Sequence, residues 1–212
     1  MDLSELRREY ITKGITRDNL HECPFKQFER WFEQAQQAGL QDPSAFSLAT
    51  AGADGQPTLR TVLLKFFDSK GFVFFTNYNS QKGQQLNENS QVAMLFPWLP
   101  LERQIKISGR AEKISTAQSV KYFASRPRGS QLGAWISAQS DPLQSRRILE
   151  EKFSAALKKL SGQDVPMPKA WGGYKIVPSS IEFWQGRENR LHDRLRYDLN
   201  ANGEWQITRL EP

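Results

Sequence analysis

The sequence predicts an α+β fold in which an antiparallel, Greek-key-like β-barrel is flanked by helices. Five short segments of strand character follow one another between residues 44 and 114, with only short connections between them. More strand segments follow residue 171, after a helical stretch, so we expect one sheet interrupted by helices. Aromatic residues make up 11% of the 212 residues, which is more than a disordered chain carries. We therefore expect one packed domain over residues 21–212.

The N-terminal half begins with a polar, poorly periodic stretch, residues 1–20, which predicts a mobile arm. From Pro24, apolar residues follow helical spacing until Gly39, which is a typical stop. Three strands in a meander are then expected at 44–51, 57–68 and 72–77. Ser80 is a typical N-cap for a short helix reaching Asn89, and strands follow at 91–98 and 102–114.

The C-terminal half begins with helices. Ser115 or Thr116 caps the first, a short one follows Pro127, and an amphipathic one ends at Gly162. A proline-rich connection leads to strands at 173–186, 189–199 and 204–210, the last two joined by a turn at 202–203.

Composition excludes several classes of protein. The one cysteine, Cys23, excludes a disulfide framework, and with only two histidines we expect no metal site. No apolar run is long enough for a membrane span, and the charged N-terminus is not a signal peptide, so we expect a cytoplasmic protein. The formal charge of +6 calls for an anionic partner or serves solubility alone. Nucleic acid is disfavoured, because the basic residues are spread over several separate elements.

The segment 190–196 carries four basic or titratable residues at alternate positions. On a strand, Arg190, His192, Arg194 and Arg196 share one face, because side chains alternate. Such a face suits an anionic or π-acceptor ligand. A solvated face paired with acidic residues explains the pattern equally well.

Three further segments could bind anions. Tyr122, Arg126 and Ser130 share one helix face if the helix continues or restarts at Pro127, and together they suit a phosphate. A basic residue that complements the helix dipole is the simpler explanation. The two others are the strand 60–65, with a basic residue at each end, and the strand-to-helix turn 76–82. Snorkelling side chains and an ordinary N-cap explain these two without a ligand.

Eight blocks of sequence, taken in order, resemble the pyridoxine/pyridoxamine 5′-phosphate oxidase family. They are LRREY at 6–10, FERW at 28–31, RTVLLK at 60–65, LFPW at 95–98, LERQ at 101–104, KYFASRPRGSQLGAW at 121–135, IEFWQG at 181–186 and RLHDR at 190–194. The resemblance covers nearly the whole chain. It implies a split-barrel flavoprotein that works as a homodimer, with FMN in a cleft between the subunits.

The resemblance also implies which residues hold FMN. Arg60 and Lys82 would bind its phosphate, with Thr76 beside them. The remaining cofactor positions are Thr61, Val62, Leu63, Leu64, Lys65, Phe75, Gln81, Gln104, Gln139, Ser140, Trp184 and Arg194. The family more often has Arg where Gln81 stands and Tyr where Phe75 stands, and the missing guanidinium near the FMN phosphate predicts weaker cofactor binding.

For the substrate, pyridoxine or pyridoxamine 5′-phosphate, the resemblance implies a phosphate grip and a ring clamp. Lys65, Tyr122, Arg126 and Ser130 would hold the phosphate. Arg190, Leu191 and His192 would contact the pyridine ring, with Arg190 and His192 as the catalytic pair. Arg7 and Tyr10 would form a lid on the N-terminal arm.

The implied reaction transfers a hydride from C4′ of the substrate to N5 of FMN, and O2 then reoxidises the flavin to give H2O2. The product is pyridoxal 5′-phosphate. The lack of a carboxylate pair agrees with this chemistry, since the cofactor carries the difficult step. A non-catalytic binder of FMN or pyridoxal phosphate and another split-barrel flavin reductase remain the alternatives.

Overall fold

The computed structural model describes residue 10 and residues 14–212. Its helices are α1 (Pro24–Gln37), α2 (Gln81–Glu88), α3 (Thr116–Ser125), α4 (Arg128–Ile136) and α5 (Arg146–Lys159). Its strands are β1 (Ala45–Ala51), β2 (Pro57–Leu63), β3 (Phe66–Asp68), β4 (Gly71–Asn77), β5 (Gln91–Trp98), β6 (Arg103–Lys113), β7 (Trp171–Gln185), β8 (Asp193–Leu199) and β9 (Trp205–Leu210). No helix among these is long and apolar enough to cross a bilayer.

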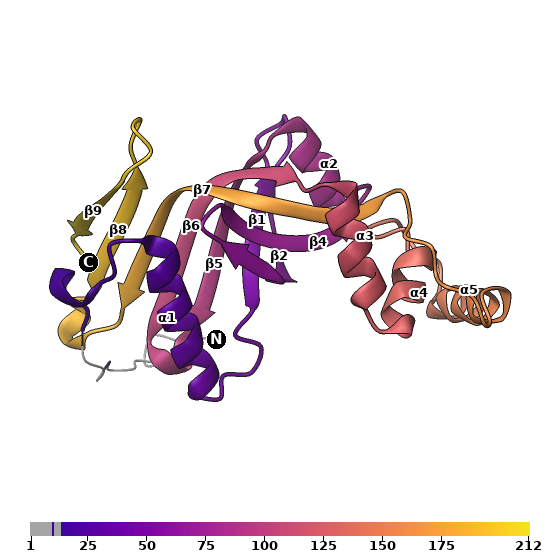
Figure 1. The fold of residues 1–212 in the computed structure, drawn as a ribbon, viewed down its shortest axis with the longest axis horizontal. Coiled ribbons are helices and arrows are strands. Elements are labelled where there is room, and N and C mark those ends of the chain that lie inside the picture. The colour runs from indigo at the N-terminus through magenta and orange to yellow at the C-terminus, as the bar shows by residue number, and fades with distance from the viewer. Residues whose placement is uncertain (1–9, 11–13) are drawn as a thin grey trace, which may run out of the picture.

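The strands form one antiparallel sheet that curls into a split barrel (Figure 1). The strand order is β2-β1-β5-β6-β7-β4-β3, and β8 and β9 extend the sheet from β7. The first and last strands of this path, β2 and β3, are separated in sequence only by Leu64 and Lys65. The Leu64 amide donates to Ser44 O at 2.8 Å, before β1, and the Lys65 amide donates to Val73 O at 2.9 Å, on β4. The chain therefore bends where it leaves one side of the barrel for the other.

This bend corrects the predicted meander. The segment expected as one strand, 57–68, is two strands, and β2 does not pair with β4. Instead β2 pairs with β1 and β4 pairs with β7. Alternation alone does not show the break, because apolar residues continue through the bend at Leu64.

The longest strand, β7, joins the two halves of the sequence. It pairs with β4 over its first residues, with β6 along its length and with β8 over its last residues. A register shift between Ser108 and Gly109 of β6 accommodates the bending of this pair. The expectation of one sheet on both sides of the helical insert is confirmed.

The main core lies between the curled sheet and α1. Phe25, Phe28, Trp31 and Ala35 form the buried stripe of this helix. Pro24 begins the helix, and Gly39 follows it at φ +69°, a left-handed conformation that favours glycine. The predicted helix is thus confirmed at both ends.

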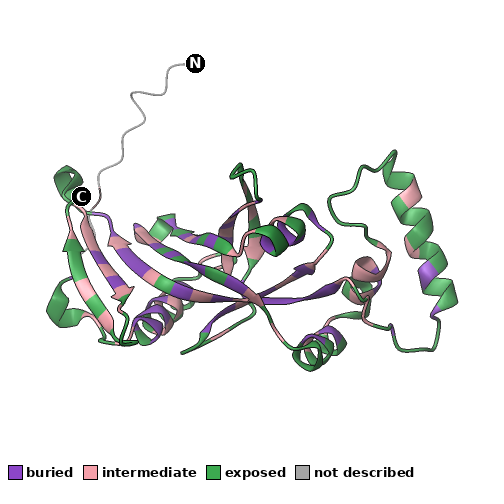
Figure 2. Ribbon diagram, turned by 90° about the horizontal axis from the view of Figure 1, so that it is seen from above, coloured by how far each residue is buried: buried purple, intermediate pink, exposed green. Residues whose placement is uncertain are grey.

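Helices α3, α4 and α5 lie together at the opposite end from β8 and β9 (Figure 1). They enclose a second, smaller core that includes Phe123, Leu132, Leu160 and Trp171. Helix α5 is exposed over most of its surface (Figure 2), with Ala156 as its buried residue. Among the residues of the expected arm, Ile15 is buried and its amide donates to Asp193 Oδ2 at 3.1 Å.

Candidate active site

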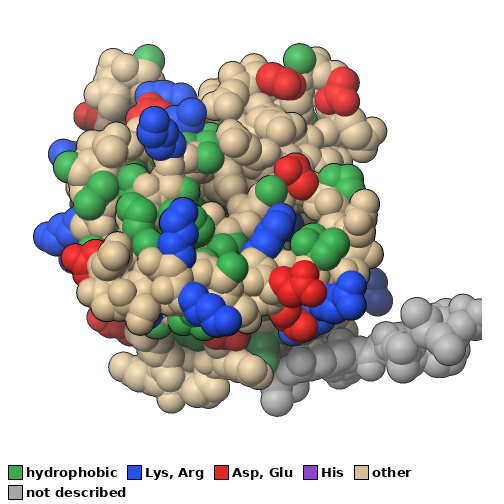
Figure 3. All heavy atoms as spheres, turned by 90° about the vertical axis from the view of Figure 1, so that its right-hand side faces the viewer, with side chains coloured by type: hydrophobic (Ala, Val, Ile, Leu, Met, Phe, Trp, Pro, Cys, Tyr) green, Lys and Arg blue, Asp and Glu red, His purple; other side chains and the backbone are tan. Residues whose placement is uncertain are grey.

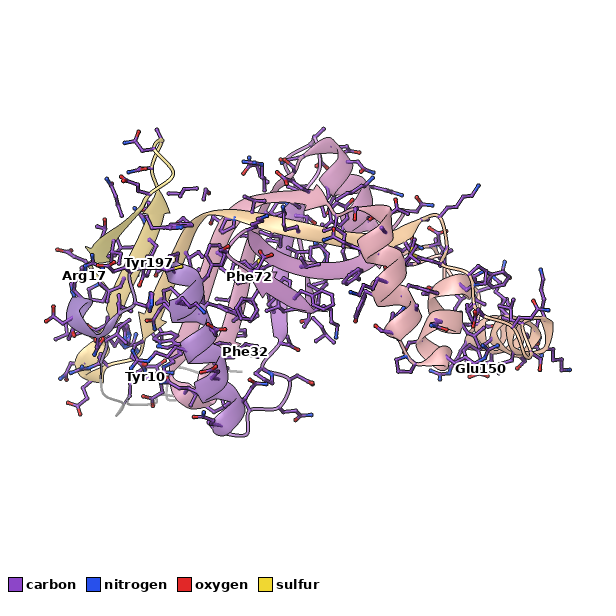
Figure 4. The ribbon with its side chains drawn as sticks, viewed as in Figure 1. Tyr10, Arg17, Phe32, Phe72, Glu150 and Tyr197 are labelled. Carbon is purple, nitrogen blue, oxygen red and sulfur yellow. The ribbon has the colours of Figure 1, made fainter. Side chains whose placement is uncertain are left out.

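The predicted site residues lie at two ends of the molecule. We call the first group the helical-end half-site, and it consists of Arg60, Thr76, Lys82, Arg126, Ser130 and Gln139. We call the second the C-terminal half-site, and it consists of Tyr10, Gln104, Trp184, Arg190, His192 and Arg194. Figure 4 shows Tyr10 at the end that carries β8 and β9, far from Glu150 on α5. Arg7 is outside the described residues.

A cavity of about 390 Å³ lies in the helical-end half-site. Phe75 and Thr76 of β4, Arg126, Ser130 of α4 and Gln139 line it, together with Trp171. The Thr76 hydroxyl donates to Gln139 Oε1 at 3.0 Å, and this bond ties the loop after α4 to the end of β4. Residues predicted for the cofactor and for the substrate phosphate therefore meet in one cavity.

Arg126 supplies the clearest anion-binding group of this cavity. Its Nη1 is buried and has no hydrogen-bond partner in the part of the chain that the structure describes, which is costly unless a ligand supplies an acceptor. Burial lowers the pKa of Arg126, because the charged form is less well solvated. Its guanidinium also lies over the Trp171 ring, 4.9 Å from the centroid. An unpaired, half-buried cation of this kind suits a phosphate.

The predicted shared helix face of Tyr122, Arg126 and Ser130 is wrong. Helix α3 ends at Ser125, and Arg126 is extended at ψ 148°. Arg126 precedes Pro127, whose ring disfavours helical geometry in the preceding residue. The chain turns there and α4 starts afresh at Arg128. Arg126 and Ser130 still line the same cavity because of this turn.

An aromatic stack supports the cavity wall. Phe75 stacks on Tyr122 with centroids 4.0 Å apart and on Trp171 at 5.2 Å. Burial raises the pKa of Tyr122, so its phenol keeps its proton at neutral pH and can donate a hydrogen bond. Sequence reasoning missed Trp171. Its only signal was an aromatic residue at the end of the proline-rich connection.

Arg60 and Lys82 are two further basic residues of the helical-end half-site. Arg60 donates to Leu48 O at 3.2 Å and to the hydroxyls of Thr50 and Thr58. Lys82 is buried, and among the described residues its Nζ makes long contacts to the hydroxyls of Thr76 at 3.3 Å and Ser80 at 3.5 Å. Burial, and then the nearby charge of Arg60, lower the pKa of Lys82.

Within the described part of the chain, no carboxylate forms an ion pair with Arg60, Lys82 or Arg126. This donor set fits the phosphate of FMN. The Ser80 hydroxyl caps α2 as predicted, accepting from the Gly83 amide at 3.4 Å. Figure 3 views the molecule from this end, where Lys and Arg side chains lie among apolar ones.

The other predicted cofactor residues of the helical-end half-site lie on β2, at the bend after it, in α2 and in the loop after α4. Thr61, Val62 and Leu63 are on β2, and Leu64 and Lys65 form the bend itself. Gln81 is exposed in the first turn of α2, and Ser140 has φ +77° in the loop after α4.

Three predicted flavin contacts form one row in the C-terminal half-site. Gln104 of β6 is directly opposite Trp184 of β7, which is directly opposite Arg194 of β8. Directly opposite residues share a face of the sheet, so the three side chains are neighbours. This row joins segments that are far apart in sequence, and only the strand register reveals it.

The predicted strand 189–199 is partly wrong. Residues Glu188–Arg190 form a 3-10 turn, and β8 begins only at Asp193. Asn189 and Arg190 have φ of +53° and +60°, so this segment cannot alternate as a strand does. Arg194 and Arg196 do share a strand face, whereas Arg190 and His192 lie in the turn before it. Leu191 is 68% exposed there.

The imidazole of His192 is oriented by its neighbours. Its Nδ1 accepts from the Arg187 amide at 3.1 Å, so the neutral ring carries its proton on Nε2. Burial, and then the charge of Arg190, lower the pKa of His192, which favours the neutral form. Its ring lies 4.6 Å from the ring of Trp184.

Tyr10 closes this aromatic group. Its ring meets Trp184 edge-on at 5.8 Å and His192 edge-on at 5.2 Å. A Cβ at Gly186 would be 2.4 Å from Tyr10 Cδ1, so glycine allows the close approach.

The two half-sites do not meet within one chain. Trp171, at the helical-end cavity, and Trp184, in the flavin row, are at opposite ends of β7. At about 3.3 Å per residue, some 40 Å of strand separates them. The two groups of predicted residues therefore do not form one continuous site within a single copy.

Fold and site together define a split-barrel oxidoreductase of the flavin-binding class. The sequence model described as pyridoxamine 5′-phosphate oxidase matches residues 32–159. The model described as the pyridoxine 5′-phosphate oxidase C-terminal dimerisation region matches residues 171–212. The chain belongs to the pyridoxine/pyridoxamine 5′-phosphate oxidase family. Because it belongs to this family, the protein is an enzyme that uses FMN as its cofactor.

Curated relatives match over the full length. The chain is 59% identical over 214 residues to the pyridoxine/pyridoxamine 5′-phosphate oxidase of Crocosphaera subtropica, with 100% of both chains covered. It is 58% identical to the protein of that name from Rippkaea orientalis, again with 100% of both chains covered.

Solved structures confirm the split-barrel fold. PhzG from Burkholderia lata, in complex with tetrahydrophenazine-1-carboxylic acid, is 31% identical with a TM-score of 0.90, covering 97% of this chain and 100% of that one. An FMN-binding protein from Nostoc punctiforme is 15% identical with a TM-score of 0.72, covering 91% and 100%, and supports the fold alone.

Proposed function

We propose that this protein oxidises pyridoxine 5′-phosphate and pyridoxamine 5′-phosphate to pyridoxal 5′-phosphate at a site built by two copies of the chain. One copy supplies the helical-end half-site and the other supplies the C-terminal half-site. The observation that carries this proposal is the division of the predicted ligands between opposite ends of β7. Phosphate-binding cations are at one end, and ring-binding groups are at the other.

A homodimer also explains the outer face of the sheet. Leu59 and Leu63 of β2 are 68% and 41% exposed, and Phe66 of β3 is 52% exposed. A cavity of about 410 Å³ beside Leu59 extends to Gln104, in the flavin row. Exposed apolar residues of this kind mark an interface. The match of residues 171–212 to a dimerisation region supports the same assembly.

FMN would be held at its phosphate by Arg60, Lys82 and Thr76, and at its ring system by the partner copy's row. Bound FMN would supply the hydride acceptor for substrate C4′ and the route by which the two electrons reach O2. The protein's task is then to orient the two ring systems and to exclude water.

The substrate would be held at both of its ends. Arg126, Ser130, Tyr122 and Lys65 supply donors to its phosphate, and Arg126 Nη1 gains the acceptor that it lacks in the chain alone. Nε2–H of His192 would donate to the ring hydroxyl oxygen, and Arg190 would lie over the ring. Tyr10 covers this ring site and excludes water. Fixing both ends places C4′ for transfer, and such positioning contributes several kcal/mol, about 7 or more in the best cases.

The test is a visible absorption spectrum of the purified protein with and without pyridoxamine 5′-phosphate under anaerobic conditions. We expect a yellow protein whose flavin bleaches with this substrate and regains its colour, with H2O2 formed, when O2 is admitted. A protein that takes up no FMN would contradict the proposal. Bound flavin that does not bleach would select a non-catalytic binder. Bleaching only by a nicotinamide would select a flavin reductase.

A further inference from the structure

A second cross-strand row lies beside the flavin row, and it is charged. Lys106 of β6 is directly opposite Glu182 of β7, which is directly opposite Arg196 of β8. Glu182 is two residues from Trp184 on the same strand, so it shares the face of the flavin row. Its side chain is only 6% exposed. Neither the mechanism above nor the family resemblance uses this carboxylate.

The Glu182 carboxylate accepts two hydrogen bonds from one edge of the Arg194 guanidinium. The Nε of Arg194 donates to Glu182 Oε1 at 2.9 Å, and its Nη2 donates to Oε2 at 3.3 Å. Lys106 Nζ is 2.7 Å from Glu182 Oε2. Arg196, directly opposite, is instead paired with Asp198 at 2.7 Å. The Glu182 carboxylate therefore forms ion pairs with Arg194 and Lys106.

These hydrogen bonds leave part of the Arg194 guanidinium available to bind a ligand. Arg194 Nη1 donates to Glu211 O at 2.8 Å, so three of its donor groups are engaged along the sheet. A guanidinium has five N–H donors, so among the described residues Nη1 and Nη2 each keep a second, unused one. Those two are fixed in direction because the planar group is held through Nε.

The charge on Glu182 is stable in this setting. Burial alone raises the pKa of a carboxyl, but hydrogen bonds from Arg194 and Lys106 outweigh it, and the pKa of Glu182 is lowered. An ion pair of this kind, made by a buried carboxylate, is weak evidence for a role in stability, since desolvation offsets much of its attraction.

We propose that Glu182 is a positioning residue for the cofactor site: its carboxylate fixes the Arg194 guanidinium so that the two remaining N–H groups point at FMN. The inference rests on the proposed function, in which Arg194 contacts the flavin. Glu182 itself touches no ligand and acts through Arg194.

The first test is FMN titration of the apoprotein, followed by quenching of flavin fluorescence, with Glu182→Gln. The amide keeps the shape but loses the charge and the bidentate grip, so we expect the FMN dissociation constant to rise about tenfold. Glu112→Gln is the matched control. Glu112 pairs with Arg110 Nε at 2.9 Å and lies 3.8 Å from Lys175 Nζ. It is, however, 41% exposed and lies outside the flavin row. We expect the control to stay within about twofold of the wild type.

A double-mutant cycle separates positioning from a general structural effect. In an Arg194→Gln background, Glu182→Gln should weaken FMN binding by less than about twofold, because its target is gone. An equal loss in both backgrounds would overturn the proposal, and so would an unchanged dissociation constant in Glu182→Gln alone. If the wild type itself takes up no FMN, the proposed function fails instead.

A measurement on the unmodified chain covers the case in which Glu182→Gln does not fold. In the wild-type apoprotein, the Nε–H of Arg194 should exchange slowly with solvent in NMR spectra, because it is held against a buried carboxylate. The Nε–H of Arg196, bonded to the 39% exposed Asp198, is the internal comparison and should exchange quickly. Fast exchange at Arg194 would contradict the fixed geometry.

Discussion

The helical-end half-site and the flavin row differ in how their basic side chains are neutralised. In the helical-end half-site, Lys82 and Arg126 have no carboxylate partner among the described residues, and Arg126 Nη1 has no hydrogen-bond partner among them. In the C-terminal half-site, Arg194 is paired with the buried Glu182. Unpaired cations are suited to phosphates, which bring their own charge. Paired cations and aromatic rings are suited to orienting a ring system without a large net field.

The contrast predicts two kinds of defect. Damage to the helical-end half-site should weaken the binding of phosphorylated ligands. Damage to the ring-binding residues Arg190 and His192 of the C-terminal half-site should slow the chemistry while FMN binding persists. The following variants test whether the molecule divides in this way.

Arg190→Ala should have the largest effect, in the C-terminal half-site. We expect flavin reduction by pyridoxamine 5′-phosphate to slow by about 100-fold, because the ring loses a positioning cation at the reacting end. The FMN dissociation constant should change by less than about twofold. Anaerobic stopped-flow absorbance measures the first quantity and fluorescence titration the second. A variant that loses FMN but reduces normally would reverse the division.

Arg126→Ala should have the next largest effect, in the helical-end half-site. Loss of a charge-assisted contact to the substrate phosphate should raise KM about 10- to 100-fold and leave kcat less affected. Arg128→Ala is the matched control, two residues further along. Its guanidinium donates to the carbonyls of Gln163 and Leu160 and does not line the cavity. Steady-state oxygen consumption should show an unchanged KM for the control, and an equal rise in both variants would contradict the assignment.

Lys82→Gln should have the smallest effect of the three. We expect the FMN dissociation constant to rise about tenfold while riboflavin, which lacks the phosphate, binds as in the wild type. The lowered pKa of Lys82 adds a pH dependence. Phosphate binding favours the protonated amine, so wild-type affinity should fall as pH rises through that lowered pKa, and the variant should lack this step. Equal losses for FMN and riboflavin would show that Lys82 does not bind the phosphate.

Local chemistry was predictable from sequence where one short segment determines it. Helix α1 begins at Pro24 and ends before Gly39 as expected, and Ser80 caps α2 as expected. These features depend on neighbours within a few residues, so spacing and capping rules suffice.

Features set by distant segments were not predictable from spacing. Leu64 and Lys65 bend because their amides bond to different sides of the barrel. The flavin row depends on a register that joins Gln104, Trp184 and Arg194 across three strands. The turn at Arg126 did have a local signal in Pro127. Pro127 correctly predicted that a separate helix follows it, whereas the extended geometry that it favours at Arg126 was missed.

The central claim is that each active site is shared between two copies of the chain. The direct test is a heterodimer purified through two different affinity tags, with Arg126→Ala in one copy and Arg190→Ala in the other. One of its two sites would carry both defects and the other would carry none, so we expect about half the wild-type activity per dimer. A heterodimer as impaired as the two parent variants would show that each chain builds its site alone, and would contradict the account.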